Sequence, residues 1–544
     1  MSNEVWWKNA VIYQIYPRSF MDSDGDGIGD IEGIIERLDY LEWLGIDAIW
    51  ICPVYKSPND DNGYDISDYM SIMDEFGDMN DMDRLISEAK KRNIRIIMDM
   101  VFNHTSDEHE WFIEAKKSKE NEYRDYYIWR DPVDGKEPND LKSVFSGSAW
   151  QLDEVTGQYY LHIFSKKQPD LNWENEKVRE NISEVVRFWL DKGVSGFRLD
   201  MIELLGKKPD EKITANGPKL HEYIKELYTK GFNANNDGEE IVTIGECWAA
   251  DTEVALKYTK PENKELSMVF QFEHSALDQV PGKDKWDLKK MELIDLKEVF
   301  EKWQTEYDEG WNTLFWSNHD LPRIVSRFGD DKKYRVESAK MLATLLYGMK
   351  GTPFIYQGEE IGMTNVKFDD ISDYRDVETK NMYNERIEQG YSKEEVMKSI
   401  YAKGRDNART PMQWSDSINA GFSFGNPWIA VNPNYKEINV EKAEMDENSV
   451  LHFYKNLIKI RKNSLCIRKG NYKSVLMQNE NVFAYTREYC GETILVLCNF
   501  SDGEIAVELH EFSMKKMIIS NYPLGEISLS DVKLRPYEAI MCEI

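Results

Sequence analysis

The segment Ser195–Asp200 carries the two residues whose types and spacing are best suited to chemistry. Side chains on a strand alternate between its two faces, so Arg198 and Asp200 should lie on the same face. The guanidinium of Arg198 would then keep the carboxylate of Asp200 ionised and lower its pKa. An ionised, oriented aspartate at a strand end is a candidate nucleophile, although a purely structural Arg–Asp pair explains these two residues equally well.

Two further acids stand at the ends of short apolar segments. Glu246 ends the segment Ile241–Glu246, and Asp320 follows the segment Thr313–Asn318. In glycoside hydrolysis one carboxylate attacks the sugar, a second with a raised pKa protonates the leaving oxygen, and a third can stabilise the oxocarbenium-like transition state. Each acid alone could be a helix cap or an ion-pair partner, but Asp200, Glu246 and Asp320 at three strand ends favour glycoside hydrolysis.

The elements that must position these acids alternate between short apolar and amphipathic segments. The apolar segments expected to be strands are Val11–Tyr16, Ala48–Pro53, Arg95–Val101, Ser195–Asp200, Ile241–Glu246, Met268–Phe272, Thr313–Asn318 and Pro353–Gly358. Most have few polar residues on either face, as strands of a parallel sheet covered on both sides should. Eight strands alternating with helices predict a (β/α)8 TIM barrel, whose active site lies at the C-terminal strand ends. A doubly wound open sheet is the alternative.

Two of the intervening segments show helical periodicity followed by a stop. Apolar residues from Ile31 to Leu41 fall on one helical face, and Gly45 follows them. The same spacing runs from Ile182 to Trp189, before Gly193. We therefore expect a helix over each of these segments.

The intervals between the predicted strands divide the chain into domains. The catalytic barrel, domain A, should occupy residues 1–104 and 175–470, and the aromatic-rich interval 105–174 should form an inserted domain B after the third strand. The highly charged interval at about 365–404 should be a helical insertion in the barrel. Short alternating strands in residues 471–544 predict a C-terminal antiparallel β-sandwich, domain C.

Composition narrows the classes of partner and compartment. The chain of 544 residues has a net charge of −30, which disfavours nucleic acid and anionic membranes as partners, and its 12% aromatic content suits sugar stacking. No apolar stretch approaches about 18 residues, so no membrane span is expected. There is no signal-peptide pattern, and the six cysteines lack the spacing of a zinc site or a disulfide framework. We expect a cytoplasmic monomer or weak homo-oligomer without an organic cofactor.

The segment from residue 22 to residue 30 carries acids at alternating positions. The oxygen ligands that a hard cation prefers are present there as the carboxylates of Asp22, Asp24, Asp26 and Asp30 and the carbonyl of Ile28. The EF-hand pattern is not met, because its twelfth position would be Gly33 instead of glutamate. The alternative is an acidic loop that binds no metal.

Several segments resemble sequence regions of a known family. The segments Asp99–His104, Gly196–Asp200, Gly245–Glu246 and Phe315–Asp320 resemble four regions of the α-amylase superfamily, glycoside hydrolase family thirteen. Gln168–Asn172 resembles the additional region of its oligo-1,6-glucosidase subfamily. The resemblance extends over nearly the whole chain and is strengthened by Asn59–Asp65, Tyr356–Glu360 and Arg405–Trp414. Stretches similar to those of the dextran glucosidases (glucan 1,6-α-glucosidases) are Gly245–Trp248, Pro261–His274 and Asn318–Arg323.

The resemblance implies a retaining, exo-acting α-glucosidase. Asp200 would be the nucleophile, Glu246 the acid/base and Asp320 the transition-state stabiliser. The residues implied to hold the terminal glucose are Asp61, Tyr64, His104, Phe164, Gln168, Arg198, His319 and Arg405. Arg409 is an alternative to Arg405, and the two histidines could instead be buried core residues. The acidic loop would be a structural calcium site away from the chemistry.

The residue after the nucleophile bears on the linkage that is cleaved. In the family, oligo-1,6-glucosidases usually carry Val at this position, and α-1,4-preferring relatives carry Thr or Ala. This chain has Met201, which is nearer to Val in character because it is apolar and has no hydroxyl. The resemblance to dextran glucosidases implies a next sugar subsite of Trp248, Lys285 and Glu378, although the last two could equally be solvated charges. The expected substrates are α-1,6-linked oligosaccharides: isomalto-oligosaccharides, short dextran and panose.

Two alternatives remain open from the sequence. One is an enzyme of the same fold that acts on trehalose-6-phosphate, α-1,4 maltose-type glucosides or sucrose, including isomerase activity. The other is a non-catalytic, transporter-associated subunit of the same fold, which the complete set of acids disfavours.

Overall fold

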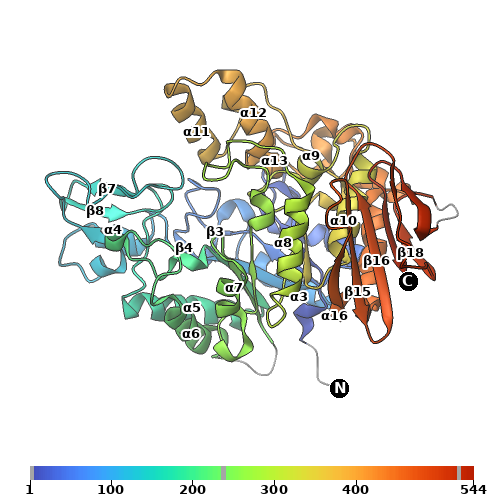
Figure 1. The fold of residues 1–544 in the computed structure, drawn as a ribbon. Helices are drawn as coiled ribbons and strands as arrows, with labels where there is room; N and C mark the ends of the chain where they lie inside the picture. Colours follow the sequence, from blue (N-terminus) through green and yellow to red (C-terminus); the bar gives the residue numbers. More distant parts are fainter. Residues whose placement is uncertain (1–4, 235–239, 524–527) are drawn as a thin grey trace.

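The computed structural model describes residues 5–234, 240–523 and 528–544, and a barrel of parallel strands forms its centre (Figure 1). The barrel strands are β1 (Ile12–Ile15), β2 (Ala48–Ile51), β5 (Arg95–Val101), β9 (Gly196–Asp200), β10 (Val242–Glu246), β11 (Met268–Phe270), β12 (Thr313–Leu314) and β13 (Thr352–Tyr356). Their order is β11-β10-β9-β5-β2-β1-β13-β12, and a parallel bridge between Val269 and Asn312 brings the two ends together. The predicted (β/α)8 barrel is therefore confirmed.

Alternation along the barrel strands separates the barrel interior from the surrounding helices. Ile12, Trp50 and Phe354 belong to one buried apolar cluster formed mainly by barrel strands. Tyr13, on the opposite face of β1, belongs to the large cluster that also contains the apolar faces of the helices. Because both faces of these strands are buried, their sequences read as nearly continuous apolar segments.

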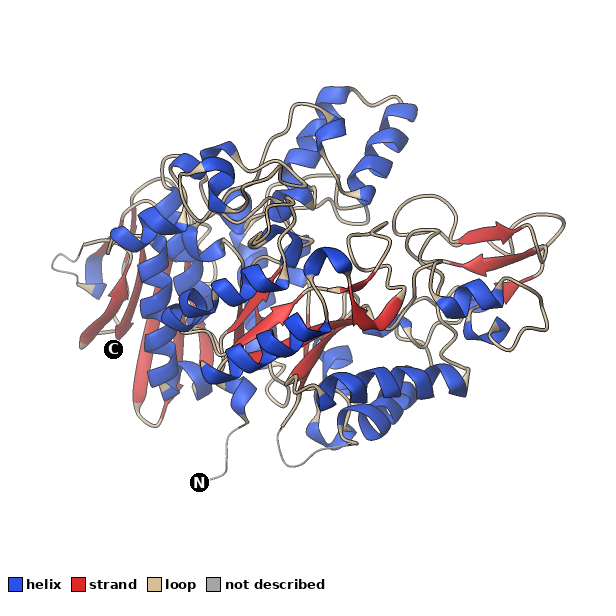
Figure 2. Ribbon diagram, turned by 180° about the vertical axis from the view of Figure 1, so that it is seen from behind, coloured by secondary structure: helices blue, strands red, loops and turns tan. Residues whose placement is uncertain are grey.

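The helices surround the barrel and extend beyond it, as Figure 2 shows in blue. Their bounds are α1 (Ile31–Glu36), α2 (Leu38–Leu44), α3 (Met79–Lys91), α4 (Glu110–Ala115), α5 (Glu176–Asp191), α6 (Leu220–Leu227), α7 (Thr252–Thr259), α8 (Leu293–Thr305), α9 (Ile324–Phe328), α10 (Arg335–Tyr347), α11 (Val377–Glu388), α12 (Lys393–Lys403), α13 (Asp406–Arg409), α14 (Val440–Met445), α15 (Val450–Asn463) and α16 (Leu465–Lys469). Among the described residues, none of these helices has the length and apolar character needed to cross a membrane.

The apolar face predicted from Ile31 to Leu41 is divided between two helices. Arg37 separates α1 from α2 with φ −103° and ψ 4°, and its guanidinium lies 4.3 Å from the ring centroid of Trp414. The prediction of one continuous helix was wrong at this point, because the backbone of Arg37 leaves the helical conformation. Gly45 ends α2 in the left-handed conformation, with φ 96°, as predicted.

A small antiparallel sheet lies between β5 and β9 in the chain, at the left of Figure 1. Its strands are ordered β6 (Trp129–Arg130), β8 (Gln158–Leu161) and β7 (Trp150–Asp153), and all lie within the interval predicted as domain B. Phe112 packs against Trp129 and Tyr160, with ring centroids 5.7 and 5.1 Å away. A short hairpin of β3 (Tyr55–Lys56) and β4 (Asp68–Ile72) precedes β5.

The C-terminal segment forms the antiparallel β domain that the sequence predicted. Its five-stranded sheet has the order β14 (Asn471–Val475), β15 (Val482–Tyr489), β16 (Glu492–Asn499), β20 (Ala539–Glu543) and β18 (Lys516–Ser520), and a separate pair joins β17 (Ile505–Val507) to β19 (Val532–Leu534). Lys297 of α8 ties this domain to the barrel, because its ammonium donates to the carbonyls of Leu476 and Asn479 at 2.8 and 2.5 Å.

Candidate active site

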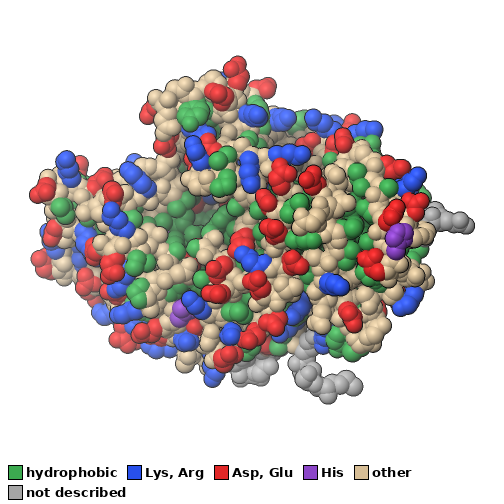
Figure 3. Space-filling model, in the orientation of Figure 1, with side chains coloured by type: hydrophobic (Ala, Val, Ile, Leu, Met, Phe, Trp, Pro, Cys, Tyr) green, Lys and Arg blue, Asp and Glu red, His purple; other side chains and the backbone are tan. Residues whose placement is uncertain are grey.

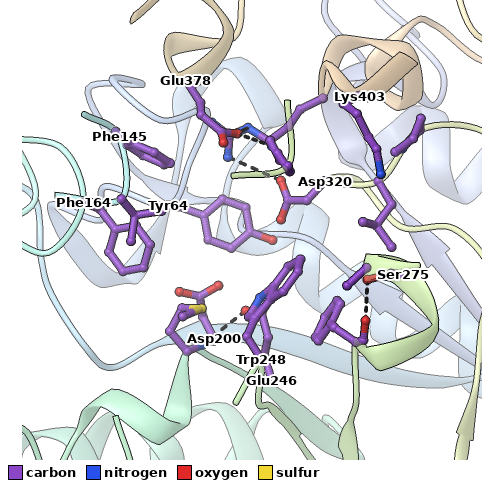
Figure 4. Close-up of a pocket in the computed structure, with 18 of the residues that line it drawn as sticks. Tyr64, Phe145, Phe164, Asp200, Glu246, Trp248, Ser275, Asp320, Glu378 and Lys403 are labelled. Atoms are coloured by element: carbon purple, nitrogen blue, oxygen red, sulfur yellow. Dashed lines mark hydrogen bonds and ion pairs between the residues drawn. The ribbon is translucent and has the colours of Figure 1, made fainter. Parts of the chain in front are cut away.

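A cavity of about 550 Å³ opens at the C-terminal ends of the barrel strands, and all three predicted acids line it. Asp200 ends β9, Glu246 ends β10, and Asp320 lies in the loop after β12. Figure 3 shows the surface hollowed between domain B and the α11–α12 insertion, with hydrophobic side chains inside the hollow. In Figure 4, Asp200 and Glu246 lie on one side of this cavity, and Asp320 and Glu378 lie across from them.

Arg198 connects the acids of the neighbouring strands. Its Nη1 donates to Asp99 Oδ1 at 2.9 Å and to Asp200 Oδ1 at 2.7 Å, and its Nη2 donates to Glu246 Oε2 at 2.5 Å. The Arg198 side chain is only 1% exposed, so these contacts are shielded from solvent. Arg198 and Asp200 thus share one face of β9, as their spacing predicted, and one guanidinium serves three carboxylates.

The predicted direction of the Asp200 pKa was wrong. Burial raises the pKa of Asp200 well above its usual range, and although Arg198 opposes this rise, the neighbouring carboxylates of Glu246 and Asp99 add to it. The sequence suggested one Arg–Asp pair, in which the cation would dominate. Because the same guanidinium is shared among three carboxylates, it cannot compensate for the loss of water around Asp200.

Asp320 has the opposite electrostatic environment. Its Oδ1 accepts from Arg409 Nη2 at 2.8 Å and lies 3.4 Å from Arg405 Nη1. Burial alone would raise the pKa of Asp320, but His319, Arg405 and Arg409 outweigh it and hold the pKa well below its usual range. Asp320 is therefore an ionised carboxylate. The arginines proposed as alternatives from the sequence both contact it.

His319 is a buried residue that lies beside Asp320. Burial and the surrounding arginines, acting against the attraction of Asp320, lower the pKa of His319 to about 3, so its ring is neutral near pH 7. Nδ1 lies 2.8 Å from Nε2 of Gln14, and Nε2 lies 3.1 Å from Asp320 Oδ2. An amide donor at Nδ1 assigns the ring proton to Nε2, the ring nitrogen that lies beside Asp320. His319 also stacks on Tyr64, with ring centroids 5.1 Å apart.

The predicted glucose-binding residues fall into two layers. Those that line the cavity are Asp61, Tyr64, His104, Phe164 and Arg405, whereas those that lie behind the lining and contact it are Gln168, Arg198 and His319. Arg405 joins two acids at the cavity wall, because its Nη2 lies 3.0 Å from Asp61 Oδ1 and 2.6 Å from Asp376 Oδ1. Burial raises the pKa of Asp61 to about 6 against the attraction of Arg405.

His104 is buried but belongs to the cavity wall. Burial lowers its pKa to about 4, so the ring is neutral near pH 7. Its Nε2 lies 3.0 Å from the carbonyl oxygen of Tyr64 and 3.1 Å from Nε2 of Gln168. The tilted ring of Phe164 packs against it, with centroids 5.3 Å apart. The ring is thus fixed by neighbouring groups while it faces the cavity.

Trp248 joins the acid Glu246 to the outer part of the cavity. The indole Nε1 donates to Glu246 Oε1 at 3.0 Å, and the indole stacks on Phe272 with ring centroids 3.8 Å apart and planes 8° apart. The Trp248 side chain is 43% exposed, so a large part of its ring can contact a ligand. Lys285 and Glu378, which could have been isolated solvated charges, line the same cavity and pair with each other at 2.6 Å.

The comparisons with known proteins agree with this geometry. Residues 14–470 match the model of the α-amylase catalytic domain, and residues 472–541 match that of the maltogenic amylase C-terminal domain. The chain belongs to the α-amylase family of glycoside hydrolases. It is 56% identical to an oligo-1,6-glucosidase of Parageobacillus thermoglucosidasius and 53% identical to a glucan 1,6-alpha-glucosidase of Streptococcus pneumoniae, each match spanning 99% of both chains.

A solved structure supports the same fold for this α-amylase family member. The trehalose-6-phosphate hydrolase TreA of Bacillus licheniformis superposes with a TM-score of 0.93 at 46% identity, covering 99% of this chain and 100% of that one. Because the match covers nearly all of both chains, the likeness extends to the arrangement of all domains. The relatives are enzymes by name, as the complete set of acids in this chain led us to expect.

Several residues of the site were missed by the sequence reasoning. Phe272 lies two residues beyond the end of β11, so the strand-end rule that found the acids could have found it too. Glu203 lies three residues beyond the end of β9, accepts from the backbone N–H groups of Trp248 and Ala249 at 3.0 and 3.1 Å, and has its pKa raised to about 7 by burial. Phe145 comes from a loop of domain B, and its place in this α-amylase family site had no sequence signal.

Three of the four aspartates predicted as metal ligands lie close together, and the fourth does not. Carboxylate oxygens of Asp22, Asp24 and Asp30 lie within 4.8 Å of one another. The Asp26 carboxylate is outside this group and accepts instead from the backbone N–H of Ile28 at 2.7 Å. An all-oxygen donor set of this kind fits a hard cation such as calcium, with Asp22, Asp24 and Asp30 as the side chains that would hold it.

Proposed function

We propose that this chain is a retaining, exo-acting α-glucosidase that releases glucose from the non-reducing end of α-1,6-linked gluco-oligosaccharides. The observation that carries the proposal is the binding of Asp200 and Glu246 by the two terminal nitrogens of one guanidinium. Carboxyl groups held by neighbouring nitrogens lie close together, and retaining enzymes need a separation of about 5–5.5 Å. Full-length relatives named oligo-1,6-glucosidase and glucan 1,6-alpha-glucosidase support the linkage.

The geometry assigns a separate task to each acid in a double displacement. Asp200 attacks the anomeric carbon while Glu246 protonates the glycosidic oxygen, and a glucosyl–Asp200 ester forms as the aglycone leaves. Glu246 then removes a proton from water, which attacks the same carbon and releases α-glucose. Asp320, kept ionised by Arg405 and Arg409, stabilises the positive charge that develops on the sugar in both steps.

The proton count in the acid cluster follows from this mechanism. The reactive form needs Asp200 ionised and a proton on Glu246, although burial favours the protonated form of Asp200. Arg198 supports the required form, because its Nη1 contacts Asp200 Oδ1 at 2.7 Å and stabilises a negative charge there. Since Asp99 and Asp200 share one cation, their titrations belong to the pair and not to either residue alone.

Exo action is supported by the closed end of the cavity. Arg405 is paired with Asp61 and Asp376, and the ring of Phe145 lies 5.0 Å from the Arg405 guanidinium. The carbonyl of Phe145 accepts from Asn381 of α11 at 3.1 Å, which links the domain B loop to the helical insertion across the cavity. A sugar chain could not continue past these groups, so only a terminal glucose would fit.

Met201 is placed where it can influence the linkage. It has left-handed backbone angles, φ 42° and ψ 41°, which direct its N–H to Glu246 Oε2 at 3.2 Å. Its side chain lines the cavity and packs near Phe164 in an apolar cluster, so it offers no hydroxyl to an α-1,4-linked aglycone. Rates on isomaltose, panose, maltose, sucrose and trehalose-6-phosphate test the proposal, and faster turnover of any of the last three than of isomaltose would refute the linkage.

The remaining expectations also stand as proposals. We propose that the loop of Asp22, Asp24 and Asp30 binds a structural calcium ion, supported by the close approach of their carboxylates. We propose a cytoplasmic enzyme, because all six cysteines are unpaired and five of them are buried. Its partner would be a small oligosaccharide, and it would bind neither nucleic acid nor a membrane. The enzyme would act as a monomer or weak homo-oligomer and would need no organic cofactor.

A further inference from the structure

One part of the cavity has no role in the glucose pocket or in the subsite of Trp248. We call it the outer lobe and define it by Ser275, Ala276, Gln279, Arg327 and Lys403, all of which line the cavity. In Figure 4, Lys403 and Ser275 lie toward the same side of the cavity, away from Phe145 and Phe164. The outer lobe is continuous with the space that contains the catalytic acids.

Lys403, the last residue of α12, brings spare hydrogen-bond donors to the outer lobe. Its side chain is only 4% exposed, and its ammonium donates to Asp278 Oδ1. Arg327 fixes the same carboxylate, with its Nε 2.7 Å from Asp278 Oδ2. An ammonium has three N–H donors, and Asp278 is its only hydrogen-bond partner within the described part of the chain. In its charged form, Lys403 therefore has two donors left for a ligand.

Gln279 offers the lobe both donors and acceptors. Its backbone is fixed, because its N–H donates to the carbonyl of Ala276 at 3.2 Å and it pairs with Leu288. Its half-buried side-chain amide has no hydrogen-bond partner among residues 5–234, 240–523 and 528–544. Since an amide has two donors and two acceptor lone pairs, an incoming polar group can satisfy it without breaking an existing bond.

The rest of the nearby wall is apolar. Ala276, Leu321 and Pro322 line the cavity together with the polar groups of Gln279 and Lys403. A pyranose ring has the matching chemistry, because its C–H faces are apolar and its rim carries hydroxyls that both donate and accept hydrogen bonds. This mixture of a few polar groups on an apolar wall is typical of small-molecule sites.

We propose that the outer lobe is a subsite for the third glucosyl unit of an α-1,6-linked chain, bound through its hydroxyls by Lys403 and Gln279. The inference rests on the proposed function, in which the closed pocket holds the terminal glucose. Trp248, with Lys285 and Glu378, would hold the second unit. The outer lobe then makes the enzyme prefer a trisaccharide to a disaccharide.

The charges around the outer lobe favour a neutral sugar over an anionic group. Burial and the neighbouring Arg327 lower the pKa of Lys403 to about 7, so its positive charge is only partial near neutral pH. Glu273 and Glu378 line the same cavity and balance the charges of Lys302 and Lys285, with which they pair. A hydroxyl, by contrast, can accept from the Lys403 nitrogen in its charged form and can exchange hydrogen bonds with its neutral form.

The test compares kcat/KM for isomaltotriose with kcat/KM for isomaltose in the full-length enzyme. The variants are Gln279→Ala and Lys403→Met, and the matched controls are Gln389→Ala and Lys398→Met, at exposed positions outside the cavity. We expect the wild-type ratio to exceed one and to fall about threefold to tenfold in each lobe variant, which corresponds to the loss of one net hydrogen bond. The controls should keep the wild-type ratio.

The outcomes separate this inference from the proposed function. A ratio near one in the wild-type enzyme would overturn the third subsite. A ratio that stays unchanged in both lobe variants would overturn it as well. If melting curves show that Lys403→Met does not fold, Gln279→Ala decides alone, because the Gln279 amide makes no hydrogen bond to the part of the chain that the structure describes. Failure of the wild-type enzyme to cleave either isomaltose or isomaltotriose would overturn the proposed function itself.

Discussion

Neutralising Asp200 and neutralising Asp320 should change the stability of the protein in opposite directions. The folded pKa of Asp200 is raised, mainly by burial, whereas that of Asp320 is lowered by His319, Arg405 and Arg409 despite its burial. A carboxyl with a raised pKa binds more protons in the folded state, so its ionisation lowers the free energy of unfolding as pH rises above about 4. A carboxyl with a lowered pKa stabilises the fold above about pH 4 and loses this contribution as pH falls.

The size of each effect follows from the contacts that remain. In Asp200→Asn, Arg198 keeps Asp99 and Glu246, so removing one buried charge should stabilise the fold by about 0.5–2 kcal/mol, the range of single stabilising substitutions. Removing one partner of a buried ion pair costs about 3–5 kcal/mol. Asp320 is 22% exposed and asparagine keeps its shape, so we expect Asp320→Asn to cost about 2 kcal/mol.

The assay is thermal unfolding of the wild type and the two variants at pH 7 and pH 4.5, with Asp369→Asn, an exposed aspartate, as the control. At pH 7 the melting temperature should rise in Asp200→Asn and fall in Asp320→Asn. At pH 4.5 the gain of Asp200→Asn should shrink, because the wild-type carboxyl is then protonated, whereas the loss of Asp320→Asn should persist. A loss of stability in Asp200→Asn at pH 7 would refute the shared-cation argument.

Three further predictions concern turnover and metal. Glu246→Gln should remove nearly all turnover of isomaltose while the melting curve stays cooperative, and near-wild-type activity would exclude Glu246 as the acid/base. Trp248→Phe keeps the stacking on Phe272 but loses the N–H donated to Glu246, so kcat should fall about fivefold to tenfold, whereas the control Trp43→Phe should not change it. A chelator should lower the melting temperature more than it lowers the initial rate at room temperature. If the purified protein holds no divalent cation and added calcium does not shift its melting curve, the segment of residues 22–30 is only an acidic loop.

The sequence predicted the barrel and its acids because both depend on local pattern. Strands buried on both faces must be apolar throughout, and the C-terminal ends of parallel strands must meet, so Asp200 and Glu246 could be placed together from their positions alone. The same rule extends to Phe272, which lies two residues beyond the end of β11 and was overlooked. Family resemblance supplied the roles of the acids, which position alone does not determine.

Features that depend on long-range contacts could not be predicted. The pKa of Asp200 depends on how many carboxylates share Arg198 and on the depth of the site, and neither is visible in the Arg–x–Asp spacing. The contact of Arg37 with Trp414, which is far away in the chain, is equally invisible in the local pattern. Gln279 and Lys403 come from different segments that meet only in the folded cavity, so their types and spacing carry no signal for a subsite.

The most direct test of the central claim is proton NMR of the first products formed from isomaltotriose and from maltotriose. The account predicts that α-glucose appears first, that it comes from the non-reducing end, and that isomaltotriose is cleaved faster. Retention follows from the close placement of Asp200 and Glu246 on Arg198, and exo action follows from the end closed by Arg405. Initial β-glucose would contradict retention, glucose released from the reducing end would contradict exo action, and faster cleavage of maltotriose would contradict the α-1,6 preference.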